Sequence, residues 1–325
     1  MKRWIWILVS IAGVAVAALF GIRMPASQSE LEVFFTATAN GNLEPCGCPV
    51  VRTGGLPRRA SYIDENSDPA VARLLIDGGD FVGPPSTEGF IQTDYLFQAM
   101  HAMGYSVLGL GAKDFAFGIE FLMRAQEHYG FTLTSANVVH AQTGEPVFEP
   151  YAFTRAGSGS IFGIPFGGIR IGIVSVMGTD IEPMCVPCTP NIEVVDPVMS
   201  ARMAVAEIRS ESDIVVVLAS TPVEQLLEIA DIPGIDIAIA ARTHHIPPGM
   251  SNVGLHGNTV VGFTGYQARR IGYMHARIGN NGIESVVGDL ISLGPAIPDR
   301  PDIARIVDRY LYELEQVTGD ESRSD

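Results

Sequence analysis

Basic residues are scarce in this chain of 325 residues, where 21 lysines and arginines stand against 36 aspartates and glutamates. The formal net charge at pH 7 is -15. A protein that binds a nucleic-acid backbone needs a basic face to neutralise the phosphates. We therefore expect no nucleic-acid partner.

Several familiar sequence patterns are also absent. The chain has no low-complexity tract, heptad run or internal repeat. No glycine cluster matches a P-loop. Covalent haem attachment is not indicated, because Cys188 is followed by Thr189 rather than by histidine. The length suits one large α/β domain or two small ones.

One long uncharged apolar run, residues 4–22, follows Lys2 and Arg3. Its length is close to the roughly 20 residues that cross a bilayer as a helix. It exceeds the apolar core of a signal peptide, which has about 7–15 residues. Because basic residues stay in the cytoplasm, the rest of the chain should lie outside it, on the periplasmic or extracellular side. We expect a retained membrane anchor or, alternatively, a signal segment over 1–22, and a linker over 23–30.

The four cysteines form two close pairs, Cys46 with Cys48 and Cys185 with Cys188. Thiols oxidise outside the cytoplasm, so an even number favours disulfides. A bond between Cys46 and Cys48 would close a small strained ring, and bonds between the two pairs suit disulfide geometry better. A four-cysteine zinc or iron–sulfur site is a second interpretation. Free or redox-active thiols are a third.

From residue 31 onward, apolar strand-like runs alternate with amphipathic helical segments. Such alternation, with continuous β-branched runs, predicts sheets covered by helices. One domain is expected over 31–317, followed by a polar tail over 318–325. We expect strands at 31–35, 72–80, 105–114, 167–178, 212–220 and 235–241, helices at 54–66, 88–104, 118–130, 196–210, 222–232 and 302–317, and a β-meander from 258 to 293.

In folds of this kind the ligand lies at the carboxyl ends of the strands, on the connecting loops. Both cysteine pairs fall in such loops. The turns expected to meet at this edge are 38–48, 78–85, 111–115, 178–188, 219–222 and 241–246.

Six short segments carry a resemblance to a known family. They are "FFTATANG" (34–41), "LLIDGGD" (74–80), "GAKDFAFG" (111–118), "SANV" (135–138), "VLAS" (217–220) and "AARTHH" (240–245). In this order they resemble the calcineurin-like metallophosphatases, specifically the 5′-nucleotidase branch, over about residues 31–295. "LEPCGC" (43–48) with "GGLPRRA" (54–60) resembles an exported subgroup. The resemblance implies a four-layer α/β/β/α sandwich.

The chemistry of that family uses two cations about 3.5–4 Å apart, bridged by one carboxylate. On the resemblance, Asp80 matches the bridging aspartate and His244 matches the second histidine of the last turn. The other positions differ. Thr38 and Asn40 replace Asp and His of the first turn, Ala112 and Lys113, followed by Asp114, replace Asn and His of the third, and Ser220 and Arg242 replace two further histidines.

Two ligands cannot hold a dinuclear centre. Lys113 and Arg242 also bring positive charge to the place of the cations, which opposes metal binding by several kcal/mol in a protein-like dielectric. We therefore expect no cofactor, an anion-binding role for Lys113 and Arg242, and a hydrogen bond from Arg242 to Asp80. Interpretations without a ligand or metal stay open. Asp80 could cap a turn, His244 could be a solvated histidine, and Lys113 could pair with Asp114.

The main functional hypothesis is a membrane-anchored, extracytoplasmic pseudoenzyme that binds a ligand or serves as an accessory or scaffold subunit of an exported or membrane complex. The first alternative is an active phosphoesterase with a rebuilt site. In it, Asp80, His244 and Asn40 hold one divalent ion, such as Mn or Zn, while Lys113 and Arg242 clamp phosphate. The second alternative is a cysteine-based redox or electron-transfer accessory.

Overall fold

The computed structural model describes residues 29–46, 52–157, 159–161, 164–181, 183, 191–242, 246–280 and 282–321. The predicted anchor at 4–22 lies outside these residues, as do Cys48, Cys185, Cys188 and His244, so their expected roles stay predictions. Among the described residues, no helix combines the length and the apolar character that a membrane crossing demands.

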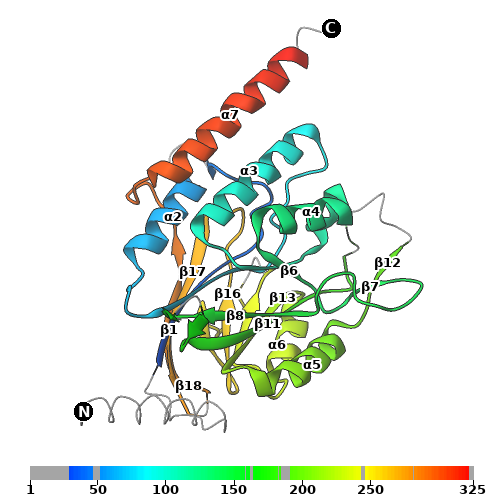
Figure 1. Ribbon diagram of the computed structural model, residues 1–325, viewed down its shortest axis with the longest axis vertical. Coiled ribbons are helices and arrows are strands. Elements are labelled where there is room, and N and C mark those ends of the chain that lie inside the picture. Colours follow the sequence, from blue (N-terminus) through cyan, green and yellow to red (C-terminus); the bar gives the residue numbers. More distant parts are fainter. Residues whose placement is uncertain are drawn as a thin grey trace, which may run out of the picture.

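Two six-stranded sheets form the body of the molecule (Figure 1). In the first sheet, four strands run parallel and a hairpin is added antiparallel at one side. Its order is β18 (Gly282–Ser292), β17 (Arg270–Gly279), β1 (Ser29–Thr36), β4 (Ala72–Asp77), β5 (Val107–Gly109) and β6 (Thr132–Thr134).

The second sheet has a parallel centre with an antiparallel strand at each edge. Its order is β15 (Val253–His256), β16 (Thr259–Phe263), β14 (Ile237–Ala240), β13 (Ile214–Ser220), β11 (Ile169–Met177) and β8 (Tyr151–Ala156). Three small two-stranded ladders complete the strands: β2 (Pro45–Cys46) with β3 (Thr53–Gly54), β7 (Val138–His140) with β12 (Ile192–Val194), and β9 (Gly159–Ile161) with β10 (Ile164–Phe166).

Helices cover the outer face of each sheet. α2 (Leu56–Glu65), α3 (Thr87–Met103), α4 (Ile119–Tyr129) and α7 (Pro301–Glu321) share one core with the first sheet. α5 (Pro197–Ile208) and α6 (Val223–Ala230) share another core with the second sheet. Short 3-10 helices occur at η1 (Ala112–Phe117) and η2 (Arg209–Glu211). The expected alternation of strands and helices is therefore present.

A third core lies between the two sheets, which makes four layers. β13 shows why its sequence is a continuous apolar run. Successive side chains of a strand point to opposite faces. Accordingly Val216 packs between the sheets, whereas Val215 and Val217 pack against the helices of the second sheet. The predicted α/β/β/α sandwich agrees with this arrangement.

The predicted β-meander over 258–293 is wrong. β16 belongs to the second sheet, where it lies parallel to β14. β17 and β18 form a hairpin in the first sheet, next to β1. Alternation of apolar residues identifies strands but carries no information about which sheet they join. The loop 264–269 thus crosses from one sheet to the other, and this crossing places it beside the predicted site.

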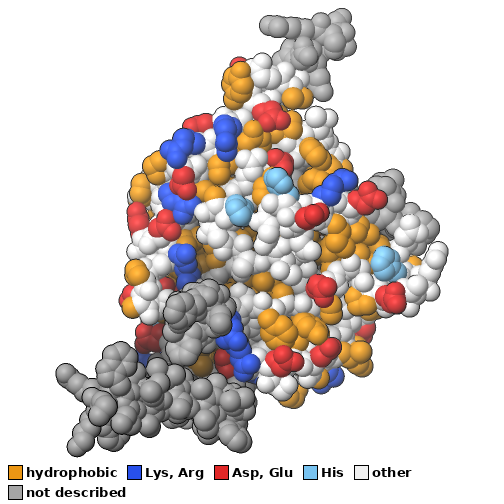
Figure 2. Space-filling model, in the orientation of Figure 1, with side chains coloured by type: hydrophobic (Ala, Val, Ile, Leu, Met, Phe, Trp, Pro, Cys, Tyr) orange, Lys and Arg blue, Asp and Glu red, His pale blue; other side chains and the backbone are white. Residues whose placement is uncertain are grey.

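Charged side chains are interspersed on the surface. On the face drawn in Figure 2, Lys and Arg side chains are scattered among acidic and apolar ones rather than gathered into one continuous basic surface. The expectation that the chain has no nucleic-acid partner stays a prediction.

Candidate functional site

The carboxyl ends of the parallel strands of both sheets meet at one edge. Gly78, which follows β4, lies so close to Ala241, which follows β14, that a Cβ on Gly78 would overlap the alanine side chain. Within the sheets, a Cβ on Gly109 would lie 2.6 Å from Ser175 Oγ of β11. Because glycine has no side chain, the two sheets approach each other closely at these positions. The sequence predicts that the turns after these strands meet at one edge.

The loops after β1 and β4 run side by side at this edge. Thr38 N donates to Gly79 O at 2.8 Å, and Asn40 N donates to Asp80 O at 2.9 Å. Thr38, Asn40 and Asp80 have φ angles of 53°, 50° and 55°. Non-glycine residues rarely adopt this left-handed conformation, and for a β-branched residue such as Thr38 it is a genuine outlier. Backbone strain of this kind gathers at functional sites.

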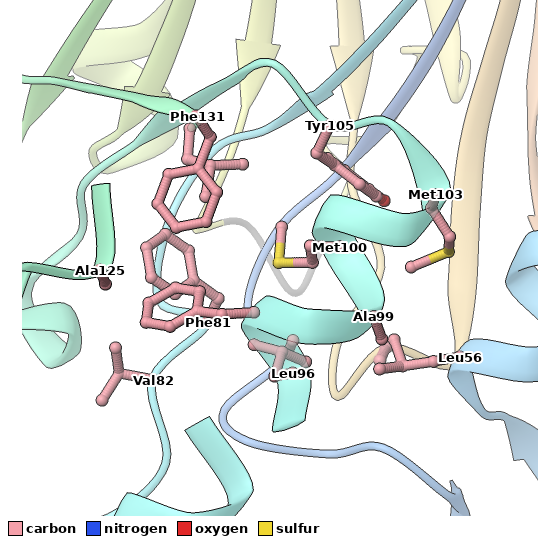
Figure 3. Close-up of a cluster of buried hydrophobic side chains, with 14 of the residues drawn as sticks. Leu56, Phe81, Val82, Leu96, Ala99, Met100, Met103, Tyr105, Ala125 and Phe131 are labelled. Carbon is pink, nitrogen blue, oxygen red and sulfur yellow. The ribbon is translucent and has the colours of Figure 1, made fainter. Parts of the chain in front are cut away.

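Asp80 is buried, with 4% of its surface exposed. Its Oδ1 accepts the backbone N–H of Lys113 at 2.9 Å. A Cβ on Gly111 would overlap the same carboxylate, so this side chain fits only against glycine. The next residue, Phe81, is fully buried in the core with Val82 beside it (Figure 3). Asp80 is therefore fixed from the core side of its loop.

Lys113 reaches over the first loop. Its Nζ donates to Asn40 Oδ1 at 2.7 Å, in a partly buried contact. Together with the Lys113 N–H bond to Asp80, this joins the first, second and third loops through three predicted site residues. The considered ion pair between Lys113 and Asp114 does not form, because the two side chains have other partners.

Asp114 organises the backbone of the site. It is fully buried, and its Oδ2 accepts Asp80 N at 2.6 Å and Gly111 N at 2.8 Å. Its Oδ1 accepts Phe81 N at 2.8 Å and Val82 N at 3.0 Å. Burial, and secondarily the Asp80 charge, raise the pKa of Asp114 well above its ordinary value, while the backbone N–H bonds oppose that shift.

A buried polar network below the site escaped the sequence analysis. Asp77 Oδ2 accepts the Thr36 hydroxyl at 2.6 Å, and Asp77 Oδ1 accepts Gly79 N at 2.9 Å. Tyr105 Oη lies 3.0 Å from Thr36 Oγ1 and accepts Arg59 Nη1 at 3.3 Å. Burial raises the pKa of Asp77, while the Thr36 bond and the Arg59 charge lower it. The network fixes the turn that leads to Asp80.

The expected bond from Arg242 to Asp80 is wrong. Arg242 Nη2 instead donates to both carboxylate oxygens of Asp180, each at 2.8 Å. Asp180 follows β11, the neighbour of β13. Gly178 lies close to the guanidinium, since a Cβ added there would be 3.3 Å from Arg242 Nη2. Because the Asp180 side chain is 48% exposed, solvent screens the pair. The pair contributes about 0–1 kcal/mol, and removing Arg242 should cost less than the roughly 3–5 kcal/mol of breaking a buried pair.

The remaining predicted positions lie at neighbouring strand ends. Ser220 is buried at the end of β13, and its carbonyl accepts Gly178 N at 2.9 Å. Ala112 is buried at the start of η1. Neither side chain offers a strong metal ligand. The direct contacts of the site therefore centre on Asn40, Asp80 and Lys113.

The described residues do not fit a dinuclear metal centre. Within the described ranges, no group of three or more His, Cys, Asp or Glu side chains could hold a metal ion. Asp80 and Asn40 supply oxygen donors of the kind that hard divalent ions prefer. These two residues alone, within the described ranges, are too few to hold two ions.

Cys46 is the one cysteine that the structure describes. It is half-buried and carries a free thiol. Its Sγ lies 3.9 Å from Gln267 Oε1, which is a weak contact. The predicted links to Cys185 and Cys188, and the four-cysteine metal site, involve residues outside the described ranges and stay predictions.

Comparisons with known proteins identify related nucleotide phosphoesterases, although no family model matches the chain. The 2′,3′-cyclic-nucleotide 2′-phosphodiesterase/3′-nucleotidase of Yersinia enterocolitica is 27% identical over 217 residues, covering 60% of this chain and 33% of that protein. The protein of the same description from Haemophilus influenzae is 28% identical over 249 residues, covering 67% and 37%. The chain thus spans about a third of the length of these curated relatives.

Solved structures show the same fold. The 5′-nucleotidase precursor of Thermus thermophilus superposes with a TM-score of 0.74 at 20% identity, covering 89% of this chain and 60% of that one. The calcineurin-like phosphoesterase YfkN of Bacillus subtilis has a TM-score of 0.74 at 18% identity, covering 90% and 99%.

These findings correct the expectation about cofactors. The expectation of no cofactor is contradicted, because the family of these relatives consists of dinuclear metal-dependent phosphoesterases. The alternative of a divalent metal is the version that the comparisons support. In sequence the chain is similar to 2′,3′-cyclic-nucleotide phosphodiesterases and 5′-nucleotidases, and in fold it resembles a 5′-nucleotidase and a calcineurin-like phosphoesterase.

Proposed function

We propose that this chain is a phosphoesterase that hydrolyses phosphate esters of nucleotides at the edge where Asp80 lies. One divalent ion would be held by Asp80, Asn40 and His244. Such an ion, when bound, lowers the pKa of a coordinated water and polarises the ester. The kinship with nucleotide phosphoesterases supports this over the pseudoenzyme hypothesis.

One observation carries the proposal: Asp80 and Asn40 stand side by side in left-handed backbone conformation, joined by the Asn40 N–H bond to Asp80 O. Each such conformation costs on the order of 1 kcal/mol or more for a residue other than glycine. A loop with a purely structural role could relieve that cost with glycine. The arrangement instead presents two oxygen donors at the strand ends.

Lys113 would bind the phosphoryl group. An ammonium has three N–H donors, and Asn40 Oδ1 accepts one of them. The others can reach phosphate oxygens and stabilise the negative charge that develops during ester cleavage. Asn40 Oδ1 has two lone pairs, so the bond to Lys113 leaves one for an ion.

The proposal is tested with the purified full chain, loaded separately with Mn²⁺ and Zn²⁺. Release of phosphate from 3′- and 5′-nucleotides, and opening of 2′,3′-cyclic nucleotides, should depend on the added ion. About one equivalent of ion per chain should be bound, as measured by elemental analysis. A folded, metal-loaded protein that cleaves none of these esters would refute the proposal.

A second candidate is a protein that binds a phosphorylated ligand without turnover. The bond between Lys113 and Asn40 favours it, because a cation already occupies part of the space beside Asp80. The same assay separates the two candidates. Nucleotide binding with no product in the presence of either ion would support the second one.

We expect Lys113→Met to have opposite effects on metal and phosphate. Removing a positive charge beside the predicted ion reduces electrostatic repulsion, so affinity for Mn²⁺ should rise about tenfold or more. Affinity for inorganic phosphate should fall about tenfold, because a charge-assisted hydrogen bond is lost. Titration calorimetry of each ligand measures both changes.

The matched control for this prediction is Arg124→Met. Arg124 is an exposed cation on α4, with 73% of its side chain accessible, and it forms a salt bridge with Glu120 on the same helix. It should leave both affinities unchanged. Equal metal affinity of Lys113→Met and the unmodified protein would place the ion elsewhere.

A further inference from the structure

A cavity of about 280 Å³ lies at the loop that crosses between the sheets. This volume approaches the lower end of the range for small-molecule sites, which is roughly 300–1,000 Å³. Its walls combine cationic, phenolic and apolar side chains, among them Thr53, Ile246, Tyr266, Arg269, Arg270 and Leu290.

Strand register places this cavity beside the Asp80 site. β17 runs antiparallel to β1, with Phe35 opposite Gly272, so Arg270 lies beyond the carboxyl end of β1. β16 runs parallel to β14, so the loop after β16 begins at the same edge. Thr38 Oγ1 donates to Gly265 O in the cavity wall at 2.9 Å. The loop of Thr38 and Asn40 therefore lies between the cavity and Asp80, because Thr38 contacts the cavity wall and Asn40 N donates to Asp80 O.

Two neighbouring arginines give the cavity its charge. Arg269 is held in place by a bond from its Nε to Thr53 Oγ1 at 2.9 Å. Among the described residues, neither Arg269 nor Arg270 forms a salt bridge. The nearby carboxylate of Asp289 accepts bonds from Asn252 and from Leu290 N, and these bonds and, secondarily, the Arg270 charge lower its pKa, so Asp289 offsets part of the Arg270 charge. Two adjacent arginines, neither in a salt bridge among the described residues, form a local concentration of positive charge in a chain of net charge -15.

We propose that this cavity is a second anion subsite, which binds a phosphate group other than the one that is cleaved. Guanidinium groups match phosphate oxygens with paired N–H donors. The apolar walls at Ile246 and Leu290 would contact the nucleoside. The preferred ligand is then a nucleotide with two phosphate groups, either a 5′-diphosphate or a 3′,5′-bisphosphate. This inference rests on the proposed function for the second contact of the ligand, at Lys113.

The test measures binding without turnover, by titration calorimetry of the full chain with chelator present. Adenosine 5′-diphosphate or adenosine 3′,5′-bisphosphate should bind about tenfold more tightly than the 5′-monophosphate, as expected for an added charge-assisted bond. The tighter of the two ligands identifies which phosphate spacing the cavity fits. The preference should weaken at high salt, because part of the site is exposed.

Arg270→Ala should remove the preference and leave monophosphate binding unchanged, while Arg270→Lys should retain part of it. The matched control is Arg277→Ala, which changes an exposed arginine farther along the same strand. The subsite proposal would be refuted if the unmodified protein bound nucleotides with one and with two phosphate groups equally tightly. A preference for two phosphate groups that survives Arg270→Ala would also refute it. Absence of hydrolysis with an intact preference would instead refute only the proposed activity.

Discussion

Asp80→Asn is expected to lower phosphate-ester hydrolysis on the order of a thousandfold, because it removes the negative charge of the predicted ion site. Asp114 cannot replace that charge, since its two oxygens accept four backbone N–H groups. Asparagine keeps an oxygen for the Lys113 N–H bond, so the loop should retain its conformation. The measurements are kcat/KM and bound metal per chain.

Asp308→Asn provides the control for this variant, because it changes an exposed carboxylate on α7. It should leave kcat/KM and metal content unchanged. An Asp80→Asn protein that keeps more than about a tenth of the activity, together with its metal, would show that the ion is not bound at this carboxylate.

Much of the fold follows from local patterns. β13 is apolar along its whole length because both of its faces are buried, and this distinguishes a central strand from an edge strand. The sheet that a strand joins depends on contacts between distant residues. β16 and β17 are separated by six residues yet belong to different sheets, and no periodicity in 258–293 reveals that.

Two features of the site had a sequence signal. Asp114 stands three residues after Gly111, where an acid can accept the free N–H groups at the start of a helical turn. In α2, Arg59 occupies the same stripe as Leu56, Ala60 and Ile63, at spacings of three and four residues. A charged residue within the buried stripe of a helix indicates a polar network in the core.

The partner of Arg242 had no such signal. Asp180 lies 62 residues earlier, in the loop after β11, and it reaches Arg242 because β13 places the ends of β11 and β14 close together. The resemblance to the family indicated that Arg242 stands where the family has a metal-binding histidine. It could not indicate which carboxylate Arg242 would contact, because that depends on the packing of two loops.

Asp114→Ala is expected to lower the free energy of unfolding by about 3–5 kcal/mol. Four buried backbone N–H groups would lose their acceptor, and an unsatisfied buried group costs about 1–3 kcal/mol. Removal of a buried carboxylate, whose pKa is raised by burial, offsets part of that loss. Chemical denaturation, followed by circular dichroism, measures the change.

The same variant tests whether Asp114 shapes the site as well as the fold. The carboxylate oxygens of Asp114 hold the backbone N–H groups of Asp80, Phe81 and Val82. Any Asp114→Ala protein that still folds should therefore bind Mn²⁺ at least about tenfold more weakly. Glu120→Ala, at a side chain that is 93% exposed on α4, should change unfolding by less than about 0.5 kcal/mol and leave metal binding intact. A cost below about 1 kcal/mol for Asp114→Ala would mean that the Asp80 loop keeps its strained conformation without this carboxylate.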